Sequence, residues 1–581
     1  MLSPGLTERV GEAVESGAEA LFARQRADGV FAPRGDRFSP SNTAVALIAL
    51  HHADAAAAEG GGRADGAAAD DPDGTIARGV TRLCEAQRPD GGWAMAGVPT
   101  ELLATAVATA ALRLTAPERA APAIRAGEEL IARLGGPEAL PEPTMTGLVR
   151  QFDALSGVGD AAALPRLPLE VLLLRGPARK LLSLRVPIFA SMALAQAAHR
   201  PQGPLRARLN KLLRPLALGV VRDAYEHEGS TGEFSTDPWL TSLISLGITR
   251  SGLAPDISRA SARSLRAMAR PDGSWDLMPL DVTWSSFATA ALLEAGHAAD
   301  PRLGATRDMF HERQQTEPFT VLGCPPGYWG FSSVHSWPMA LETAEISSGL
   351  VRLPGGTADD HARRGIDWLT TMQDSSGSWS LAVRDSKPGG FGPCPHMTAK
   401  AVRALLDWGV SPEDRRVVKA LRWLGRTQHA DGSFEAMWYR GRTPGTAVVL
   451  EAFCRAGRGT APPAVRARDR LLGTQQEDGS WSAGADDEAA AGTVEETAWA
   501  LHALLSAGTD PHGEAAASAA RWLIDAQCAD GSWQGAPVNE YVRLCSRYAD
   551  DGIASGLAVR ALARLRSAAA STGSTAGKAG A

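Results

Sequence analysis

Apolar residues return every three or four positions through most of this chain, which is the spacing of helices that bury one face. In the C-terminal half these stretches come in pairs separated by a loop. The clearest stretches lie at 362–372, 398–409, 417–427, 446–457, 496–508 and 519–526. The alternating pattern typical of strands is absent. The pattern therefore predicts an all-α protein built from helical hairpins.

A short motif, Q-x-x-D-G-x-W or a close variant, stands between the paired stretches. Its seven copies begin at Gln25, Gln87, Ala269, Gln373, Gln428, Gln475 and Gln527. The Asp-Gly pair favours a turn, and its carboxylate can accept hydrogen bonds from the free N–H groups of the next helix. The Gln can bond to neighbouring backbone while the Trp covers the junction. We interpret the repeat as a structural staple and assign no chemistry to its residues.

Length and charge narrow the class of protein. A chain of 581 residues is too long for one ordinary core and predicts two large domains. Its net charge of −6 gives no general attraction to nucleic acid or to an anionic membrane. The six cysteines lie far apart without a C-x-x-C pair, which favours a reduced cytoplasmic location over a disulfide framework or a zinc site. No apolar signal region opens the chain, and no run reaches the roughly 18 apolar residues that span a bilayer.

Seven such repeats in an all-α chain resemble the squalene–hopene and oxidosqualene cyclase family, which also includes class II diterpene cyclases. The resemblance extends to DPWLTSLISLG at 237–247 and DVTWSSFATAALLEAG at 281–296. It implies two α-helical barrels (α/α toroids), one inserted into the other, with the active cavity between them. The expected segments are an N-terminal helix over 1–20 that joins the catalytic barrel, an inserted barrel over 21–299, the catalytic barrel over 300–568 and a disordered tail over 569–581.

In that family the reaction starts with a proton from a carboxylic acid in a D-x-D-D motif ahead of Thr-Ala. Clustered carboxylates cannot all ionise, so one stays protonated and can protonate an alkene or an epoxide. Here the matching frame reads PMALETA, in which Met339 and Leu341 replace the first two acids. Leu341 takes the place of the proton donor, and only Glu342 remains. Flanked by apolar residues, Glu342 would be desolvated and mostly protonated near neutral pH.

The resemblance also implies partners for Glu342. The segment CPHMTAKAV matches the one that supplies the donor's partner, so His396 is expected beside Glu342, with Cys394 or Lys400 as alternatives. A His–Glu pair can return a proton to the acid between turnovers. Substrate contacts, including ring faces that stabilise a carbocation, are expected from Trp284, Trp329, Phe331, Trp337, Met339 and Leu341. The alternative is structural, with Glu342 capping its helix and the histidine and aromatic rings filling the core.

Two functions therefore stay open on the sequence. The first is a divergent class II terpene cyclase that carries out a proton-initiated cyclisation of a linear isoprenoid with a terminal alkene or epoxide. Only 6% of the residues are aromatic, which favours a shorter isoprenoid with few ring closures. The second is a catalytically silent relative that binds or presents an isoprenoid lipid, which Leu341 at the donor position favours. The β-subunit of protein prenyltransferases shares the barrel type. It binds zinc through Asp, Cys and His residues, and this sequence does not show those residues at the required spacing.

Cofactors and partners follow from the same interpretation. Proton-initiated cyclisation needs no redox cofactor and no metal, and Mg²⁺ is expected only if the substrate carries a diphosphate. The Leu-rich, basic segment 164–189 predicts an interfacial helix for peripheral membrane contact. An ordinary packed helix with snorkelling cations is the alternative. A homodimer is left open, and no nucleic-acid partner is expected.

Overall fold

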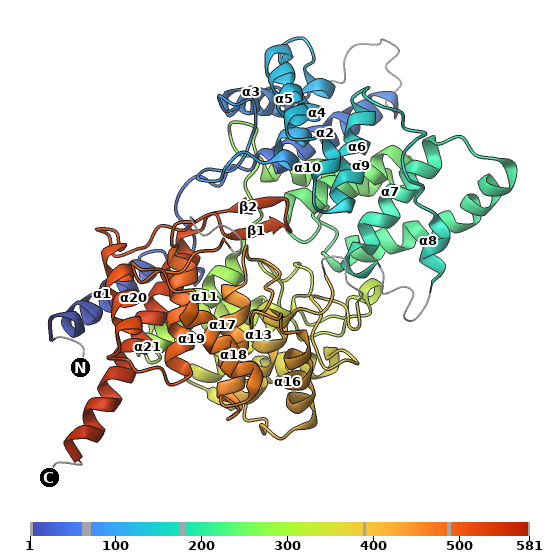
Figure 1. The fold of residues 1–581 in the computed structure, drawn as a ribbon. Helices are drawn as coiled ribbons and strands as arrows, with labels where there is room; N and C mark the ends of the chain where they lie inside the picture. Colours follow the sequence, from blue (N-terminus) through green and yellow to red (C-terminus); the bar gives the residue numbers. More distant parts are fainter. Residues whose placement is uncertain (1–3, 61–70, 175–181, 387–390, 485–489, 579–581) are drawn as a thin grey trace.

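A computed structural model describes residues 4–60, 71–174, 182–386, 391–484 and 490–578 (Figure 1). Within these ranges the chain is helical apart from short 3₁₀ turns, isolated bridges and one two-stranded hairpin. The predicted all-α class with two helical barrels is confirmed. The hairpin is an exception that the sequence pattern did not predict. No helix in the described part is long and apolar enough to cross a membrane.

The C-terminal barrel has a closed inner ring of six helices. Each ring helix packs against the next, and the last returns to the first. In ring order they are α11 (Asp281–Ala295), α13 (Ala340–Arg352), α15 (Pro395–Asp407), α17 (Thr443–Arg455), α19 (Val494–Ser506) and α21 (Asp551–Lys578). Most residues of these helices are buried, as expected of helices that are surrounded by others.

An outer layer of helices covers this ring, one against each inner helix. The outer helices are α1 (Pro4–Phe22), α12 (Arg302–Glu312), α14 (Asp360–Met372), α16 (Arg415–Thr427), α18 (Pro462–Gly473) and α20 (Glu514–Asp525). The N-terminal helix α1 packs on α21 and α20, which joins the first residues of the chain to its last helices.

The N-terminal domain repeats this arrangement on a smaller scale. Its inner helices pack in the order α4, α2, α9 and α7, with α6 against α4. The bounds are α2 (Pro40–Gly60), α4 (Leu102–Thr115), α6 (Pro143–Leu155), α7 (Val186–His199) and α9 (Pro238–Ser251). The outer helices are α3 (Thr75–Glu85), α5 (Ala121–Arg133), α8 (Pro204–His227) and α10 (Pro255–Met268).

The domain boundary differs from the one expected. The predicted inserted segment, 21–299, includes α11, but α11 packs against α13, α21 and α1 and completes the C-terminal ring. We therefore propose that the inserted domain ends at residue 280. Residues 569–578, predicted as part of a disordered tail, continue α21 as helix; the last three residues lie outside the described ranges.

The repeats act as staples between helices. The five Trp residues that end a copy are fully buried, and each indole N–H donates to a carbonyl ten residues earlier, as from Trp379 to Leu369 at 2.8 Å. The Gln side chain bonds to backbone of its own turn and of the next outer helix, as Gln373 does with Gly377 and Arg416. The Asp bonds to the N–H two residues later, so it closes the turn instead of capping the next helix as predicted.

A β-hairpin joins the two domains (Figure 1). Strands β1 (Asn539–Val542) and β2 (Ser546–Tyr548) pair antiparallel with a register irregularity. The hydroxyl of Tyr541 donates to Asp237 at the start of α9, and the N–H of Arg547 donates to Glu101 at the start of α4. These bonds hold the hairpin against the N-terminal domain.

The predicted interfacial helix over 164–189 is not formed in the described part of that segment. Leu169–Leu173 and Ser183–Arg185 are 3₁₀ turns, and α7 begins at Val186. Residues 175–181, with three of the predicted basic side chains, lie outside the described ranges. Leu172 is buried while Leu173 is 53% exposed, so only part of the predicted apolar face reaches the surface.

Candidate active site

A cavity of about 530 Å³ lies where the two domains and the hairpin meet. The N-terminal domain contributes side chains of α6, α7 and α9, and the C-terminal barrel contributes side chains of α11 and α13. The volume falls within the range of pockets that enclose small organic ligands. Most of the lining is apolar, for example Leu148, Leu243, Phe287, Phe331 and Phe391. This composition suits a hydrocarbon ligand.

Glu342 lines this cavity from the first turn of α13. It is 7% exposed, and its neighbours Met339 and Leu341 also line the cavity. The Thr283 hydroxyl on α11 donates to Oε1 of Glu342 at 2.9 Å. Burial raises the pKa of Glu342 to about 7, with a smaller contribution from the nearby charge of Glu345. A carboxyl group that is half protonated at neutral pH therefore faces an apolar space.

Glu345, one turn further along α13, behaves in the opposite way. Lys400 forms an ion pair with it, and an Arg403 nitrogen lies 3.6 Å from its second oxygen. Although burial acts in the other direction, these cations hold the pKa of Glu345 at about 2. Glu345 is thus held as an anion one turn along α13 from Glu342, and of these two groups only Glu342 can give up a proton near neutral pH.

The structure does not bring His396 to Glu342. The His396 ring is buried and meets the rings of Tyr439 and Trp499 edge-on, with centroids 5.3 and 6.1 Å away. Neither ring nitrogen has a hydrogen-bond partner. Burial, with the charge of Lys400, lowers the pKa of His396 to about 3, so the ring is neutral. The expected His–Glu pair is therefore corrected to a Thr283–Glu342 pair.

The predicted aromatic residues divide into two groups. Phe331 lines the cavity, whereas the lining does not include Trp284, Trp329 or Trp337. Each of these three indoles uses its N–H for an internal hydrogen bond, to Asp550 Oδ2, to the Phe310 carbonyl and to Glu228 Oε1 respectively. They pack the core around the site and do not face the ligand space.

Trp329 belongs to a further copy of the repeat that the sequence pattern concealed. Gln314 bonds to the carbonyls of Gly327 and His361 in the way that the repeat glutamines do. The indole of Trp329 donates to a carbonyl of the preceding helix, and its backbone N–H donates to Thr343. An insertion between the Gln and the Trp lengthens this copy, which is why the short motif did not reveal it.

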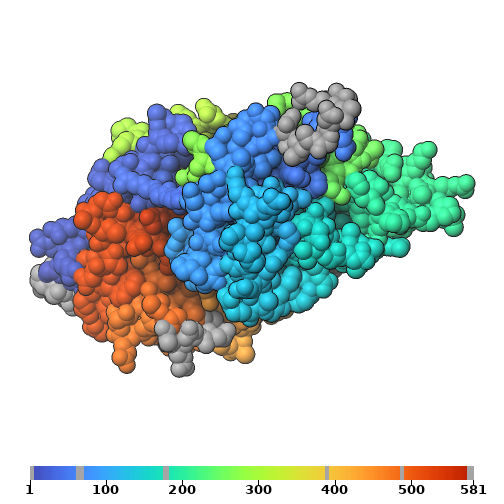
Figure 2. All heavy atoms as spheres, turned by 90° about the horizontal axis from the view of Figure 1, so that it is seen from above, coloured from blue at the N-terminus to red at the C-terminus, as the bar shows by residue number. Residues whose placement is uncertain are grey.

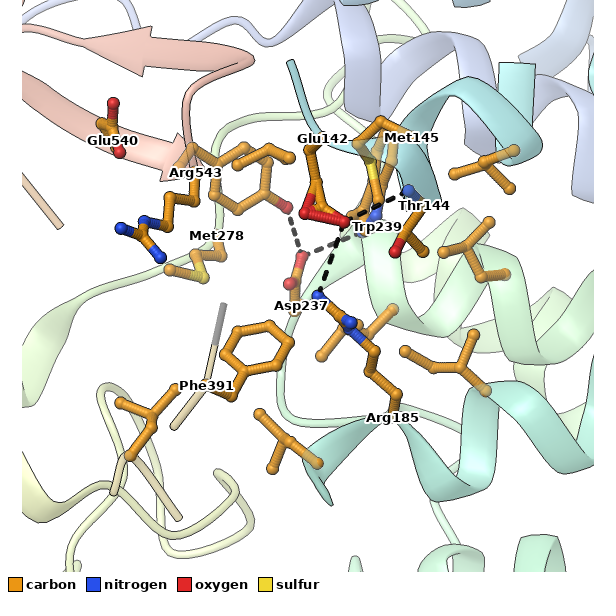
Figure 3. Close-up of a pocket in the computed structure, with 18 of the residues that line it drawn as sticks. Glu142, Thr144, Met145, Arg185, Asp237, Trp239, Met278, Phe391, Glu540 and Arg543 are labelled. Atoms are coloured by element: carbon orange, nitrogen blue, oxygen red, sulfur yellow. Dashed lines mark hydrogen bonds and ion pairs between the residues drawn. The ribbon is translucent and has the colours of Figure 1, made fainter. Parts of the chain in front are cut away.

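Several polar residues of the site were missed by sequence reasoning. Asp237 caps α9, and its Oδ1 accepts from Tyr541 Oη at 2.6 Å and from the Trp239 N–H at 2.9 Å. Burial raises the pKa of Asp237 to about 6. Figure 3 shows its side chain directed into the space bounded by Met278 and Phe391. The sequence signal was an Asp-Pro pair before an apolar helix, which predicts a cap and gives no hint of a cavity.

Glu142 and Arg185 form a second polar group in the same wall (Figure 3). Glu142 caps α6 by accepting from the Thr144 N–H at 3.1 Å, and an Arg185 nitrogen lies 3.9 Å from the same carboxylate. The guanidinium of Arg185 also stacks on the Phe391 ring at 4.8 Å. Within the described residues, no group of three His, Cys, Asp or Glu side chains is arranged to hold a metal ion.

Two family models match the chain. The model described as "Squalene-hopene cyclase C-terminal domain" matches residues 282–541, and "Squalene-hopene cyclase N-terminal domain" matches residues 68–184. Together the two matches cover more than half of the chain. It belongs to the squalene–hopene cyclase family. The first of the two matches begins within α11, in agreement with the assignment of that helix to the C-terminal barrel.

Individual relatives match shorter stretches. A squalene–hopene cyclase of Bradyrhizobium diazoefficiens is 31% identical over 288 residues, which are 43% of this chain and 43% of that protein. The labda-7,13-dienyl diphosphate synthase of Streptomyces clavuligerus is 37% identical over 91 residues, 16% of each chain. This chain thus spans less than half the length of these two curated relatives. Among solved structures, an ent-copalyl diphosphate synthase from Streptomyces platensis has the same fold, with a TM-score of 0.53, 19% identity, and coverage of 96% of this chain and 99% of that one.

Proposed function

We propose that this protein is a class II terpene cyclase in which Glu342 protonates a linear isoprenoid held in the cavity. The observation that carries the proposal is the placement of Glu342, whose pKa burial raises to about 7, at the start of α13 in the wall of a largely apolar cavity. A general acid is most effective when its pKa lies near the working pH, because the acid form is then populated and still transfers its proton.

The reaction follows from this geometry. The Glu342 proton adds to the terminal alkene carbon or to the epoxide oxygen, and the neighbouring π bonds attack the cation that forms. The faces of Phe287, Phe331 and Tyr439, which line the cavity, are available to stabilise the moving charge by about 0.5–2 kcal/mol for each contact. Because the ligand space is apolar, water does not trap the cation early. No redox step and no cofactor enters this scheme.

An epoxide is the more favourable starting group. A lone glutamic acid with a pKa of about 7 is a weak acid, and an epoxide oxygen is more basic than an isolated alkene. Met339 and Leu341 replace two acids of the family motif, so Glu342 has no second motif acid beside it to strengthen it as a proton donor. We therefore expect an isoprenoid epoxide to react faster than the corresponding hydrocarbon.

The alternative is a protein that binds an isoprenoid without converting it. Leu341 at the donor position and the neutral, unpaired His396 both favour this alternative. Incubation of the protein with squalene, 2,3-oxidosqualene and geranylgeranyl diphosphate, followed by product analysis by mass spectrometry, separates the two. A cyclised product supports the enzyme, whereas saturable binding of an isoprenoid without any new product supports the silent protein.

Thr283 is expected to set the pH dependence of the reaction. Glu342 must be protonated to act, so activity is high below a pH of about 7 and falls about tenfold for each unit above it. The Thr283 hydrogen bond stabilises the ionised form, so Thr283→Val raises the pKa further and moves the inflection to higher pH. Loss of the bond that orients the acid lowers kcat by about tenfold.

The measurement is a profile of kcat against pH. Thr283→Ser keeps the hydroxyl and is expected to keep the wild-type profile. An unchanged inflection in Thr283→Val would show that this hydroxyl does not act on the group that titrates. Ser286 is a control on the same helix, because its hydroxyl donates to the Thr283 carbonyl and not to the acid; Ser286→Ala leaves the inflection in place.

Peripheral membrane contact remains a proposal, and the surface that we assign to it includes Leu173 of the predicted segment and extends to α8. Leu173 is exposed on a turn that packs against α8, and Leu205 and Leu212 on α8 are 81% and 75% exposed. The end of the molecule that carries α8 projects from the body of the N-terminal domain (Figures 1 and 2). Exposed leucines at this end can enter the lipid interface without a spanning helix.

Changing Leu173, Leu205 and Leu212 together to Asp is expected to reduce binding to phosphatidylcholine vesicles by at least about tenfold, because each buried leucine contributes about 1.5–3 kcal/mol. Co-sedimentation measures this. Leu134 and Leu544, which are also exposed, are matched controls at other places on the surface. Equal sedimentation of the triple variant and the wild type would remove this surface from consideration. The cytoplasmic location and the homodimer stay predictions.

A further inference from the structure

Proton-initiated cyclisation has to end as well as begin, and the cavity holds other carboxyl groups besides Glu342. Glu142, Asp237 and Glu540 also line it. A carbocation that is not captured by water ends when a base removes a proton from a carbon next to the positive charge. Such a base must be ionised, must face the ligand space and must be shielded from bulk solvent.

Asp237 meets these requirements better than the other two. Glu142 lies against the guanidinium of Arg185 and its side chain is 20% exposed, so its charge is already balanced and reached by solvent. Glu540 lies on strand β1, away from Asp237 and Phe391 in Figure 3, and burial raises its pKa to about 7. Asp237 is 4% exposed, and Figure 3 shows it projecting from the start of α9 towards the middle of the cavity.

Hydrogen bonds at the start of α9 stabilise the Asp237 anion and act against burial, which raises the pKa of this carboxyl group to about 6. Tyr541 Oη and the Trp239 N–H both donate to Oδ1, and the N–H groups at the start of α9 add the positive end of the helix dipole. Glu342 has one side-chain donor, Thr283, and lies near the anion of Glu345. Burial raises the pKa of both groups, to about 6 for Asp237 and about 7 for Glu342, and Asp237, with its two donors, is the one that ionises first as the pH rises.

We propose that Asp237, supported by the Tyr541 hydroxyl, is the base that ends the reaction. This inference rests on the function proposed above. A C–H bond next to the cationic carbon breaks, its electron pair becomes the new C=C bond, and the proton binds to the Asp237 carboxylate. Over one turnover Glu342 loses a proton and Asp237 gains one, so the substrate is isomerised without net consumption of acid. Water restores both groups to their starting states after the product leaves.

The placement of the two groups on different domains gives the proposal a structural consequence. Glu342 belongs to the C-terminal barrel, Asp237 belongs to the N-terminal domain, and Tyr541 belongs to the hairpin that joins them. A chain held between the domains has its reactive end at Glu342 and its last cation at Asp237. The position of the final double bond is therefore set by which carbon reaches Asp237.

The test is the product distribution of Asp237→Asn, measured by mass spectrometry and NMR with the substrate that the wild type converts. Asn can still cap α9 and accept from Tyr541, so the fold is retained, but it cannot take a proton. We expect substrate consumption within about tenfold of the wild type. The share of the wild-type alkene is expected to fall at least about tenfold, in proportion to the usual contribution of a general base, with isomeric alkenes or water-captured alcohols in its place.

Tyr541→Phe keeps the carboxylate and removes one donor, so it is expected to shift the products in the same direction by a smaller amount. If Asp237→Asn is insoluble, the product distribution of Tyr541→Phe alone tests the proposal. An unchanged product distribution in the folded Asp237→Asn protein, or in Tyr541→Phe when that variant stands alone, would overturn the proposal. So would complete loss of conversion with substrate binding retained, because that result would place Asp237 in the first step. Failure of the proposed function is a separate result, namely a wild type that converts no isoprenoid.

Discussion

Glu342→Gln is expected to bind its isoprenoid substrate and to lose turnover by at least about 10³-fold, within the range that general acids contribute. Glutamine has the size and hydrogen-bonding shape of the protonated acid but has no proton to give. The Thr283 hydroxyl can still donate to its amide oxygen, so the local geometry is kept. Single-turnover conversion and ligand binding, measured on the same preparation, separate loss of chemistry from loss of affinity.

The chain provides a matched control for this variant. Glu496 stands in the same ETA sequence on α19 as Glu342 does on α13, is buried, and has a pKa that burial also raises to about 7. Its side chain pairs with Thr493 at the start of its own helix, and it does not line the cavity. Glu496→Gln is therefore expected to keep wild-type turnover. Equal turnover in Glu342→Gln and in the wild type would show that Glu342 is a helix-start residue like Glu496.

Stability gives an independent check on Glu342. Its pKa in the folded protein, about 7, lies above the ordinary value of 4.5. The native state therefore holds more protons between these values, and stability falls as the pH rises through that window. Glu342→Gln removes this dependence and is expected to be more stable than the wild type at pH 8 by about 3 kcal/mol. Urea unfolding at pH 5 and pH 8 measures the difference.

Arg560→Met is expected to lower the free energy of unfolding of the C-terminal barrel by about 3–5 kcal/mol, the range found when one partner of a buried ion pair is removed. Arg560 on α21 lies 2.9 Å from Glu451 on α17, and His502 on α19 bonds to the other Glu451 oxygen at 2.8 Å. Burial and the charge of Arg560 lower the pKa of His502, so the imidazole cannot replace the lost cation fully.

This ion pair is part of a network to which every helix of the inner ring contributes. Its members in ring order are Glu294, Glu345, Lys400, Glu451, His502 and Arg560, with Arg352 and Arg403 between them. Because the charges of both signs are enclosed together, removing one leaves the others without compensation. The network fixes the six helices relative to one another and thereby holds Glu342 and Thr283 in register.

Urea unfolding followed by circular dichroism measures the loss. The double variant Glu451→Met/Arg560→Met removes both charges and is expected to recover part of the stability, since no uncompensated ion is left. Arg458→Met breaks an exposed pair with Glu413 at 2.9 Å and is expected to cost less than about 1 kcal/mol. If Arg560→Met costs no more than Arg458→Met, the network does not stabilise the ring.

The functional site was only partly readable from the sequence, and particular residues show why. Glu342, Met339, Leu341 and Phe331 line the cavity, and the sequence singled them out because the PMALETA frame and its neighbours match a family pattern; their roles stay predictions. His396 was placed wrongly, since a match in sequence does not specify which face of α15 points to α13 and which to α17 and α19. The tryptophans were assigned to the ligand because of their type, whereas their indole N–H groups are used within the core.

Asp237, Thr283 and Tyr541 could not have been identified as a group from the sequence. Thr283 is 59 residues from Glu342, and Tyr541 is 304 residues from Asp237. Each of them has an ordinary local role, as a helix cap, a residue of a first helical turn or a strand residue. Their common role arises only from the cavity that they share.

The sequence by itself determined the helical class and the paired helices of the C-terminal half, because helical periodicity and the Gln-to-Trp staples depend on residues close together in the chain. It also indicated the family and the single acid, Glu342, that remains in the PMALETA frame. Only the tertiary structure decided that α11 completes the C-terminal ring, that Thr283 and not His396 pairs with Glu342, and that Asp237 faces the same cavity across the domain interface. The reason is physical: protonation and hydrogen bonding are set by burial and by neighbours within a few ångströms, and these neighbours come from helices that lie far apart along the chain.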